Sequence, residues 1–315
     1  MRIIEGCRKF NIEGESAVAI GKFDGIHLGH RQLISELLKQ KKCGRKAVIF
    51  TFDPEPGTFF SGHTVPGLST REEKRAWFQE CGIDVLVEFP LTAETAAMKP
   101  EAFVSEILVG MIHAVYIAAG TDVSFGDQGR GDYRLLQKMS SQYGYEVHLI
   151  QKVNLNGREI SSTYVRAEVA CGHMEMARKL LGIPYTVSGT VEHGRHLGHT
   201  IGVPTVNLLP PEGKLLPPNG VYYSLVTVGD RTYRGMTNIG CKPTVTDEGR
   251  IGVETYLYDF SGDLYGQFIE VAILAYRRPE KHFKGIQELE AQMKQDIADG
   301  ILFHEDYQKN ALQKA

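Results

Sequence analysis

Residues 17–30 read AVAIGKFDGIHLGH, and this stretch decides the fold of the first half of the chain. The apolar residues at its start favour a buried strand, and a helical pattern with Leu33 and Ile34 on one side begins near His30. The glycines in between let the backbone approach a ligand closely. The start of the helix adds free N–H groups and the positive end of its dipole. The stretch therefore predicts a strand, a phosphate-binding loop and a helix.

The same step from strand to helix recurs along the chain to residue 150. Thr70 lies three residues before Glu73, a capping-box pattern that marks the start of one helix. Further strands are expected at 47–52, 85–89, 115–119 and 146–150, with helices at about 71–81, 101–112 and 133–142. This alternation predicts an α/β fold in which helices cover both faces of a parallel sheet. Ligands of such sheets bind beyond the carboxyl ends of the strands.

The second half of the chain has a different pattern, with short β-runs separated by Gly and Pro. Gly229-Asp230 is a two-residue hairpin signal between two of these runs. Strands are expected at 186–192, 205–208, 221–228, 231–237, 253–258 and 267–275, followed by a helix at about 285–299. We expect a small antiparallel barrel closed by this helix. Gly182 and Pro184 place the boundary between two domains, 1–184 and 185–315.

Composition excludes several classes of protein. The net charge of −3, with both signs scattered, gives no global field for nucleic acid or anionic lipid. The five cysteines are odd in number and never form a CxxC pair, so we expect reduced thiols, not a disulfide frame or a zinc site. No apolar run approaches the roughly 18 residues of a membrane span, and the first residues lack the pattern of a secretory signal. We expect a cytoplasmic protein with neither nucleic-acid nor membrane partners.

Two motifs point to a phosphate site in the first domain. His27 and His30 are three residues apart, so both imidazoles can face one ligand and stabilise charge that develops on a phosphate. An isolated pair of this kind is more often a surface feature or a helix cap, but the strand-loop-helix context favours the ligand site. Ser161-Ser-Thr163 offers three hydroxyls that can cap a helix or bind phosphate oxygens. Arg166 lies in the first turns of that helix, where the dipole disfavours a cation unless an anion is near.

The second domain holds another set of candidate residues. Thr205 and Asn207 share one face of a strand and offer hard oxygens suited to Mg²⁺, although they also fit the plain start of a strand after Pro204. Glu254 lies in the middle of an apolar strand, which indicates either a solvated face or a carboxylate with a chemical role. No GxxxxGK[ST] motif occurs, so ATP cannot be held by a P-loop. HLGH recurs at His196–His199, but neither copy has further Cys or His at the spacing of a zinc site.

The first motif set closely resembles the HxGH and SSTxxR motifs of bacterial bifunctional FAD synthetases, in the nucleotidylyltransferase superfamily. The resemblance implies a Rossmann-like domain in which His27 and His30 hold the α-phosphate of ATP and Arg166 holds the departing pyrophosphate. It implies further nucleotide contacts from Gly21, Lys22, Phe23, Asp24, Gly25, Ser161, Ser162 and Thr163. It also implies a flavin pocket that contains Asp53, Asp122, Phe125 and Asp127. Glu55 and Val123 depart from the family, which usually has His and an aromatic residue there.

The second motif set resembles riboflavin kinase. This resemblance implies ATP contacts at Gly194, Gly202 and Pro204, Mg²⁺ ligands at Thr205 and Asn207, and a general base at Glu254 that takes the proton from the riboflavin 5′-hydroxyl. Tyr256 stands where the family commonly has His.

Together the resemblances imply an enzyme that phosphorylates riboflavin to FMN and then adenylylates FMN to FAD with release of pyrophosphate. The expected partners are riboflavin, FMN, ATP and Mg²⁺, and the expected state is a monomer or weak homo-oligomer. Two alternatives remain open: only one domain is active, or the chain is a flavin-binding regulator without turnover. The four residues His27, His30, Arg166 and Glu254 argue against the regulator, because flavin binding does not need them together.

Overall fold

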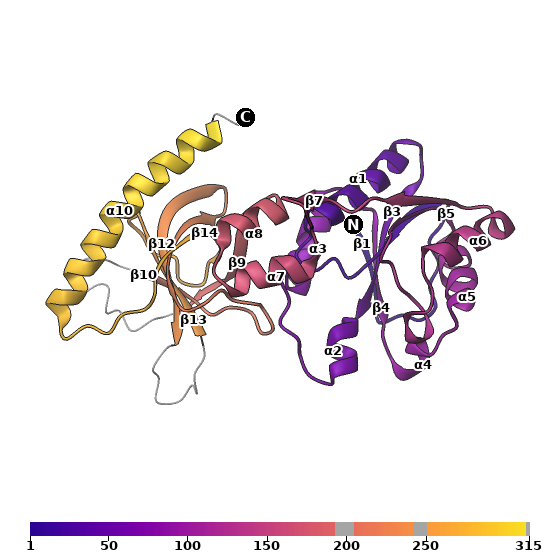
Figure 1. The fold of residues 1–315 in the computed structure, drawn as a ribbon, viewed down its shortest axis with the longest axis horizontal. Helices are drawn as coiled ribbons and strands as arrows, with labels where there is room; N and C mark the ends of the chain where they lie inside the picture. The colour runs from indigo at the N-terminus through magenta and orange to yellow at the C-terminus, as the bar shows by residue number, and fades with distance from the viewer. Residues whose placement is uncertain (193–204, 242–250, 313–315) are drawn as a thin grey trace. The chain divides into compact units, whose positions relative to one another are not determined.

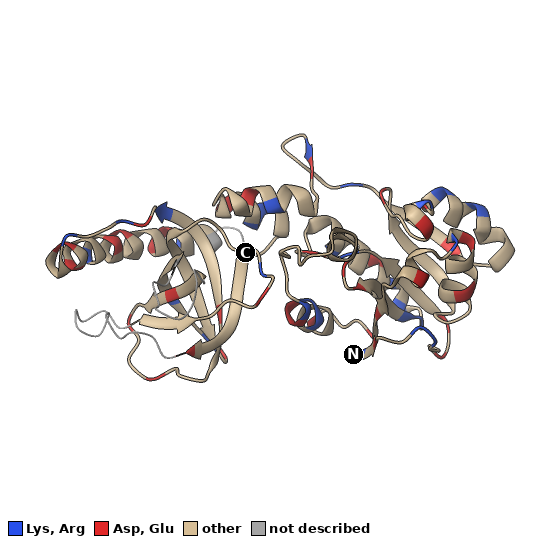
Figure 2. Ribbon diagram, turned by 90° about the horizontal axis from the view of Figure 1, so that it is seen from below, with Lys and Arg blue, Asp and Glu red and all other residues tan. Residues whose placement is uncertain are grey.

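The computed structural model describes residues 1–192, 205–241 and 251–312 (Figure 1). The chain divides into two compact units, Met1–Tyr164 and Val165–Ala315. Figure 2 shows acidic and basic residues mixed along the helices of both units. None of the helices in the described ranges has the length and hydropathy that a bilayer crossing requires.

The first unit is built on a parallel six-stranded sheet in the order β1-β4-β3-β2-β5-β6. Its strands are β1 (Arg2–Glu5), β2 (Ser16–Ile20), β3 (Lys46–Asp53), β4 (Val85–Pro90), β5 (Ala114–Gly120) and β6 (Glu146–Ile150). Its longer helices are α1 (Leu28–Lys42), α3 (Arg71–Glu80) and α6 (Tyr133–Tyr143), with shorter ones at α2 (Pro56–Ser61), α4 (Ala93–Ala96), α5 (Pro100–Ala102) and η2 (Asp127–Gly129). The predicted parallel sheet is confirmed.

Alternate residues of the central strands enter two separate cores, one on each face of this sheet. Val18 of β2 belongs to the core that includes Leu136 of α6, whereas its neighbour Ala19 belongs to the core that includes Leu37 of α1. This two-sided burial explains why the strands read as continuous apolar runs in the sequence. Helices therefore cover both faces, as the sequence predicts.

The strand order places two loops together at the point where the sheet changes direction. β2 has β3 on one side and β5 on the other, and the chain moves from the β4 side to β5 late in the unit. The loops that follow β2 and β5 therefore leave neighbouring strands at the same edge. This is the position where open α/β sheets bind their ligands.

Some elements of the first unit differ from expectation. The helix expected at 101–112 is α5 followed by a π-helix, η1 (Phe103–Val109), whose wider turn changes the side-chain period. β1 was not expected, because only Ile4 of its four residues is buried and no alternation is visible. The two-residue strands β7 (Asn154–Leu155) and β8 (Arg158–Glu159) were also not expected.

The second unit contains a closed antiparallel barrel in the order β10-β13-β12-β11-β14-β9. Its strands are β9 (Tyr185–Glu192), β10 (Thr205–Leu208), β11 (Gly220–Val228), β12 (Arg231–Cys241), β13 (Ile251–Leu257) and β14 (Phe268–Arg278). Val228 pairs with Arg231 across Gly229-Asp230, which confirms the hairpin prediction. The barrel and its closing helix are as predicted.

Three helices lie between the parallel sheet and the barrel in the sequence or pack on the barrel. α7 (Ser162–Ala170) crosses from the first unit into the second, and α8 (Met174–Leu181) packs on β9 and β14. Gly182 ends α8 with a left-handed φ of 79°. α10 (Ile286–Leu312) is longer than the predicted helix at 285–299, since apolar side chains such as Phe303 continue to pack on the barrel after Gly300.

Candidate active sites

The loop after β2 is tightly folded and anchored by Phe23. Phe23, Gly25 and Ile26 all have positive φ angles, of 51°, 77° and 42°. The Phe23 ring is fully buried, with an edge-on contact to Phe78 and a tilted contact to His30 at centroid distances of 5.6 and 5.1 Å. The expected nucleotide contact at Phe23 can therefore involve only its backbone. A bulky residue with left-handed φ costs energy, and here the aromatic packing holds it in place.

Asp24 joins three segments of the first unit. Its Oδ1 accepts hydrogen bonds from the backbone N–H groups of Leu68 at 2.7 Å and Ser69 at 3.2 Å, and only 2% of the residue is exposed. Its backbone oxygen accepts a hydrogen bond from Ser162 Oγ at 2.9 Å. The structure thus brings the Ser/Arg motif against the His-containing loop. The buried carboxylate also fastens the segment that leads into α3, a role that the motif alone does not reveal.

His27 and His30 form a stacked pair at the start of α1, in which His27 is buried and His30 is half-buried. Their ring centroids are 3.8 Å apart with 20° between the planes, and His27 is the N-cap residue. The Nδ1 atoms of both rings are buried and have no hydrogen-bond partner in the part of the chain that the structure describes. Such orphaned polar atoms are rare unless a ligand or water satisfies them. The pair lies at the helix start, which is where a phosphate would bind.

Burial keeps both imidazoles neutral. It lowers the pKa of His27 to about 4, although the charge of Asp122 opposes this shift. It also holds the pKa of His30 well below the ordinary 6.5, with smaller contributions from His27 and Lys74. Neutral imidazole carries one N–H donor and one acceptor nitrogen, so at neutral pH each ring can donate one hydrogen bond to a phosphate oxygen. The influence of Asp122 on His27 also shows that the loops after β2 and β5 lie near each other.

The Ser/Arg motif begins α7. Ser161 Oγ accepts a hydrogen bond from the Tyr164 N–H at 3.3 Å, which is the capping contact that the simpler interpretation anticipates. Ser162 instead contacts the loop after β2, while Thr163 is exposed. Arg166 follows on the same helix, just beyond the division of the two units. One hydroxyl caps the helix and another joins the two motifs.

The residues predicted to hold flavin separate into two kinds. Asp53 forms an ion pair with Arg71 at 2.8 Å, and Asp122 lies 3.6 Å from Lys152, so both carboxylates are charged groups near the surface. Asp127 lies 3.4 Å from Arg130. Phe125 differs, because only 2% of it is exposed and its ring stacks in the core on Phe103 at 5.1 Å. The Phe125 ring therefore supports the loop from beneath.

A charged network beside Asp53 has no counterpart in the motifs. Glu88 is 5% exposed and accepts hydrogen bonds from both Arg71 and Arg75 of α3. Burial alone would raise the pKa of Glu88, but the hydrogen bonds from Arg75 and Arg71 lower it overall. Glu55, where the family usually has His, pairs with Lys74 at 2.5 Å. A mid-strand Glu in β4 was the only sequence signal for this network.

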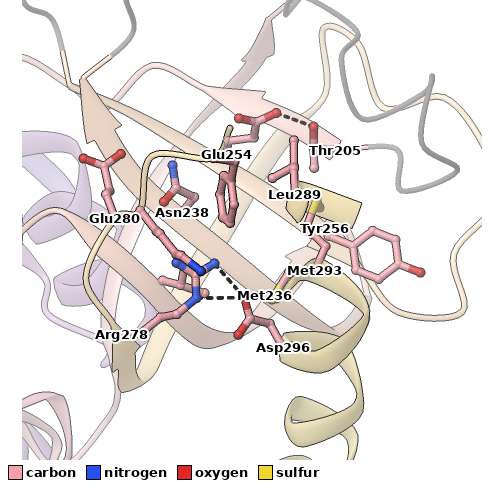
Figure 3. A pocket seen from close by; sticks show the side chains of 13 residues that line it. Thr205, Met236, Asn238, Glu254, Tyr256, Arg278, Glu280, Leu289, Met293 and Asp296 are labelled. Carbon is pink, nitrogen blue, oxygen red and sulfur yellow. Dashed lines mark hydrogen bonds and ion pairs between the residues drawn. The ribbon is translucent and has the colours of Figure 1, made fainter. Parts of the chain in front are cut away.

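The barrel carries a pocket of about 250 Å³ on its outer wall, beneath α10 (Figure 3). Glu254 of β13 faces it, and Glu254 Oε1 accepts a hydrogen bond from Thr205 Oγ1 at 2.5 Å. Asn207 and Asn238 occupy the register positions on either side of Glu254, so their side chains share its face of the barrel. Glu254 therefore does not lie on the plain solvated face that its sequence context alone would favour.

On the inner face of the barrel, three hydroxyl side chains of neighbouring strands form a chain of hydrogen bonds. Thr237 Oγ1 lies 2.7 Å from Ser224 Oγ and 2.9 Å from Thr255 Oγ1, and all three residues are at most 1% exposed. This chain joins β11, β12 and β13 and opposes any slip of register. A slip of one residue would turn Glu254 inward.

Several lining residues of this pocket were not among the predicted site residues. Arg278 of β14 forms a forked contact with the fully buried Asp296 of α10, with Nη2 at 2.6 Å and Nε at 2.9 Å from Oδ2. The pocket is lined by Thr205, Val221, Met236, Asn238, Glu254, Tyr256, Arg278, Glu280, Lys281, Phe283, Leu289, Met293 and Asp296. Tyr256, which stands where the family commonly has His, is among them. The predicted ATP contacts at Gly194, Gly202 and Pro204 lie outside the described residues.

Comparison with known proteins finds two family models along this chain. A family model described as FAD synthetase matches residues 9–164, and one described as riboflavin kinase matches residues 181–301. The bifunctional riboflavin kinase/FMN adenylyltransferase of Escherichia coli (strain K12) is 35% identical over 301 residues, which cover 94% of this chain and 96% of that protein. The protein of the same name from Listeria monocytogenes is 36% identical over 291 residues, 91% of each. A crystal structure of a macrolide-efflux protein from Streptococcus pneumoniae superposes with a TM-score of 0.83 at 28% identity, covering 94% of this chain and 97% of that one.

Proposed function

This chain belongs to the family of bifunctional riboflavin kinase/FMN adenylyltransferases, and we propose that its two reactions take place at two separate sites, one in each half of the chain. The chain converts riboflavin to FMN and FMN to FAD, with ATP as the second substrate of both reactions. The proposal concerns which residues do this. As functional domains we keep 1–184 for the adenylyltransferase and 185–315 for the kinase.

The kinase reaction is assigned to the pocket beneath α10. The observation that carries this assignment is the position of Glu254, a carboxylate that faces the pocket and contacts Thr205. Glu254 accepts the proton of the riboflavin 5′-hydroxyl as that oxygen attacks the γ-phosphate of ATP, and ADP leaves. The apolar lining from Leu289 and Met293 receives the flavin ring.

Mg²⁺ is proposed to bind beside this carboxylate. Thr205 and Asn207 supply hydroxyl and amide oxygens, and Mg²⁺ prefers oxygen ligands. The two side chains share one face of β10, so both can contact one ion. When bound, Mg²⁺ would neutralise charge on the phosphates of ATP. Among the described residues no group of three or more His, Cys, Asp or Glu is placed to hold a metal ion.

The adenylyltransferase reaction is assigned to the edge of the parallel sheet at the loop after β2. The FMN phosphate oxygen attacks the α-phosphorus of ATP, and pyrophosphate leaves, so the protein needs no covalent nucleophile. His27 and His30 donate hydrogen bonds to the α-phosphate from their ring nitrogens, a role that their position at the start of α1 supports. Arg166 is proposed to contact the departing pyrophosphate, and Asp53, Asp122 and Asp127 to border the flavin. A cytoplasmic location and a monomeric or weakly associating state are part of the same proposal.

The assay that tests this function uses purified protein with riboflavin, ATP and Mg²⁺, and follows FMN and FAD by chromatography. FMN and ADP should appear first, followed by FAD and pyrophosphate, and both steps should stop when the metal is chelated. Protein that makes FMN but never FAD, even from added FMN with excess ATP, would contradict the proposal that the His and Ser/Arg motifs are an active site.

A further inference from the structure

Glu280 is a second carboxylate at the pocket that holds Glu254. It follows β14, lines the pocket and is exposed to solvent. Its Oε2 accepts a hydrogen bond from Asn219 Nδ2 at 3.2 Å. Figure 3 shows Glu280 and Asn238 on the side of the pocket opposite Met293. The pocket therefore has a polar side with hydrogen-bonding groups and an apolar side supplied mainly by α10.

The backbone of β12 makes room for this carboxylate at Gly240. A Cβ atom built on Gly240 would lie 1.9 Å from Glu280 Oε1, closer than any real contact. Gly240 has no left-handed φ, so the missing side chain, not an unusual backbone, is what the position requires. Any other residue would push the carboxylate away. Asn219 therefore holds Glu280 by a hydrogen bond, and Gly240 leaves the space that its carboxylate occupies.

The chemistry of a carboxylate limits what Glu280 can recognise. An ionised carboxylate only accepts hydrogen bonds, and it repels the phosphates of ATP. It therefore suits a ligand group that donates hydrogen bonds and carries no negative charge. Riboflavin has such groups in the hydroxyls of its ribityl chain, between the flavin ring and the 5′-oxygen that reacts.

We propose that Glu280 accepts hydrogen bonds from the ribityl hydroxyls of riboflavin, and that Gly240 contributes by leaving space for Glu280 at the pocket. The inference rests on the proposed placement of the kinase reaction at Glu254. Glu254 and Glu280 line the same pocket, so a riboflavin molecule whose 5′-hydroxyl reaches Glu254 has its ribityl chain in the pocket that Glu280 borders. Glu280 is then a specificity-determining residue for the sugar-alcohol chain.

The test compares riboflavin with an analogue that has the same ring and a 5-hydroxypentyl chain, which keeps the reacting hydroxyl and lacks the other three. Hydrogen bonds to a charged group change kcat/KM by roughly 10- to 100-fold. Wild-type protein should prefer riboflavin by about that factor, and Glu280→Ala should lose most of the preference through a higher KM for riboflavin. Glu280→Gln, whose amide oxygen still accepts a hydrogen bond, should keep part of it.

Gly240→Ala gives an independent arm, because it keeps the carboxylate but displaces it. The clash involves the end of a flexible side chain, so the fold should survive, which circular dichroism would verify. Gly240→Ala should reduce the preference as Glu280→Ala does, and should add nothing in the double variant. Glu290→Gln is the matched control, since this acid of α10 pairs with Lys294 and does not line the pocket.

The inference is overturned if Glu280→Ala keeps the wild-type preference for riboflavin, or if its only defect is a higher Mg²⁺ requirement. An additive effect of Gly240→Ala in the double variant would overturn the role of Gly240. Glu254→Gln separates this result from the proposed function. If Glu254→Gln retains full activity with both substrates, the assignment of the base fails, whereas the preference measured for Glu280 still decides the inference made here.

Discussion

The stacked imidazoles at the start of α1 have low pKa values mainly because they are buried. His27 and His30 lie three residues apart at a helix start, so the sequence predicts that both rings face one ligand. It does not reveal that the rings stack on each other, or that Phe23 contacts His30 from the core. Those contacts depend on a loop with three positive φ angles, only one of them at glycine. Local sequence patterns do not encode such a loop, because tertiary packing holds it.

The low pKa of His27 gives a prediction with a definite sign. Its pKa is about 4 in the folded protein and near 6.5 when unfolded, so the unfolded chain binds the proton first as the pH falls. This residue should leave stability unchanged above pH 6.5 and lower the free energy of unfolding progressively between 6.5 and 4. At about 1.4 kcal/mol per pKa unit, the full loss is about 3 kcal/mol.

A pH titration of the ring protons by NMR would check this, with the His27 signal assigned by comparison with His27→Gln. The ring should stay neutral until the pH approaches 4. A midpoint near 6.5 would mean that the ring is solvated and not buried against His30.

Arg166 gives a prediction for the adenylyltransferase alone. Its loss should remove a charge contact that strengthens in the transition state, which typically raises the activation barrier by about 2 to 4 kcal/mol. Arg166→Ala should therefore slow FAD formation from FMN by about 30- to 1,000-fold and leave FMN formation unchanged. Lys179→Ala, which removes an exposed cation from α8, serves as the control. Equal rates of FAD formation for both variants would show that the pyrophosphate has another partner.

At the scale of secondary structure, the regular elements follow from the sequence and the irregular ones do not. Strands β2 to β6 lie within one or two residues of the predicted ranges, since apolar runs bounded by turn signals determine them. The capping box at Thr70 and Glu73 is formed as predicted. α10 extends to Leu312 because its second half packs on Tyr223 of the barrel, a contact with no local signal.

The attachment of α3 to β4 depends on the buried carboxylate of Glu88. Glu88→Ala would leave Arg71 and Arg75 with, among the described residues, only their ion pairs to Glu5 and Asp53, and the lost hydrogen bonds to a charged group should cost about 1.5 to 3 kcal/mol. Glu94→Ala is the matched control, because Glu94 pairs with Arg8 at the surface and such pairs contribute about 0 to 1 kcal/mol. Urea unfolding at neutral pH would measure both. A similar small loss for the two variants would contradict the structural role given to Glu88.

For the molecule as a whole, the order of the motifs predicts two sites, but not the full membership of either. The sequence predicts the strands that carry Thr205 and Glu254. Their contact follows from the register in which β10 and β13 pair. Arg278 and Asp296 were not predicted, because they meet only when α10 lies on the barrel wall. The FAD synthetase model matches residues up to 164, and the riboflavin kinase model matches residues from 181 onward. Each motif set lies within one of these matches, except for Arg166.

The central claim is that the two reactions use chemically separate sites. Glu254→Gln removes the base of the kinase and should lower FMN formation by roughly 10² to 10⁴, while supplied FMN is still converted to FAD near the wild-type rate. His30→Ala should lower the conversion of supplied FMN to FAD and leave FMN formation from riboflavin near the wild-type rate. Changes that share no partners have nearly independent effects.

The most direct measurement is therefore the rate of FAD formation by Glu254→Gln with FMN as the only flavin, in protein shown to be folded by circular dichroism. We predict a rate close to that of the wild type, alongside a severe loss of FMN formation from riboflavin. If Glu254→Gln abolishes FAD formation from supplied FMN, the two reactions share a site or depend on each other, and the account of two separate sites is wrong.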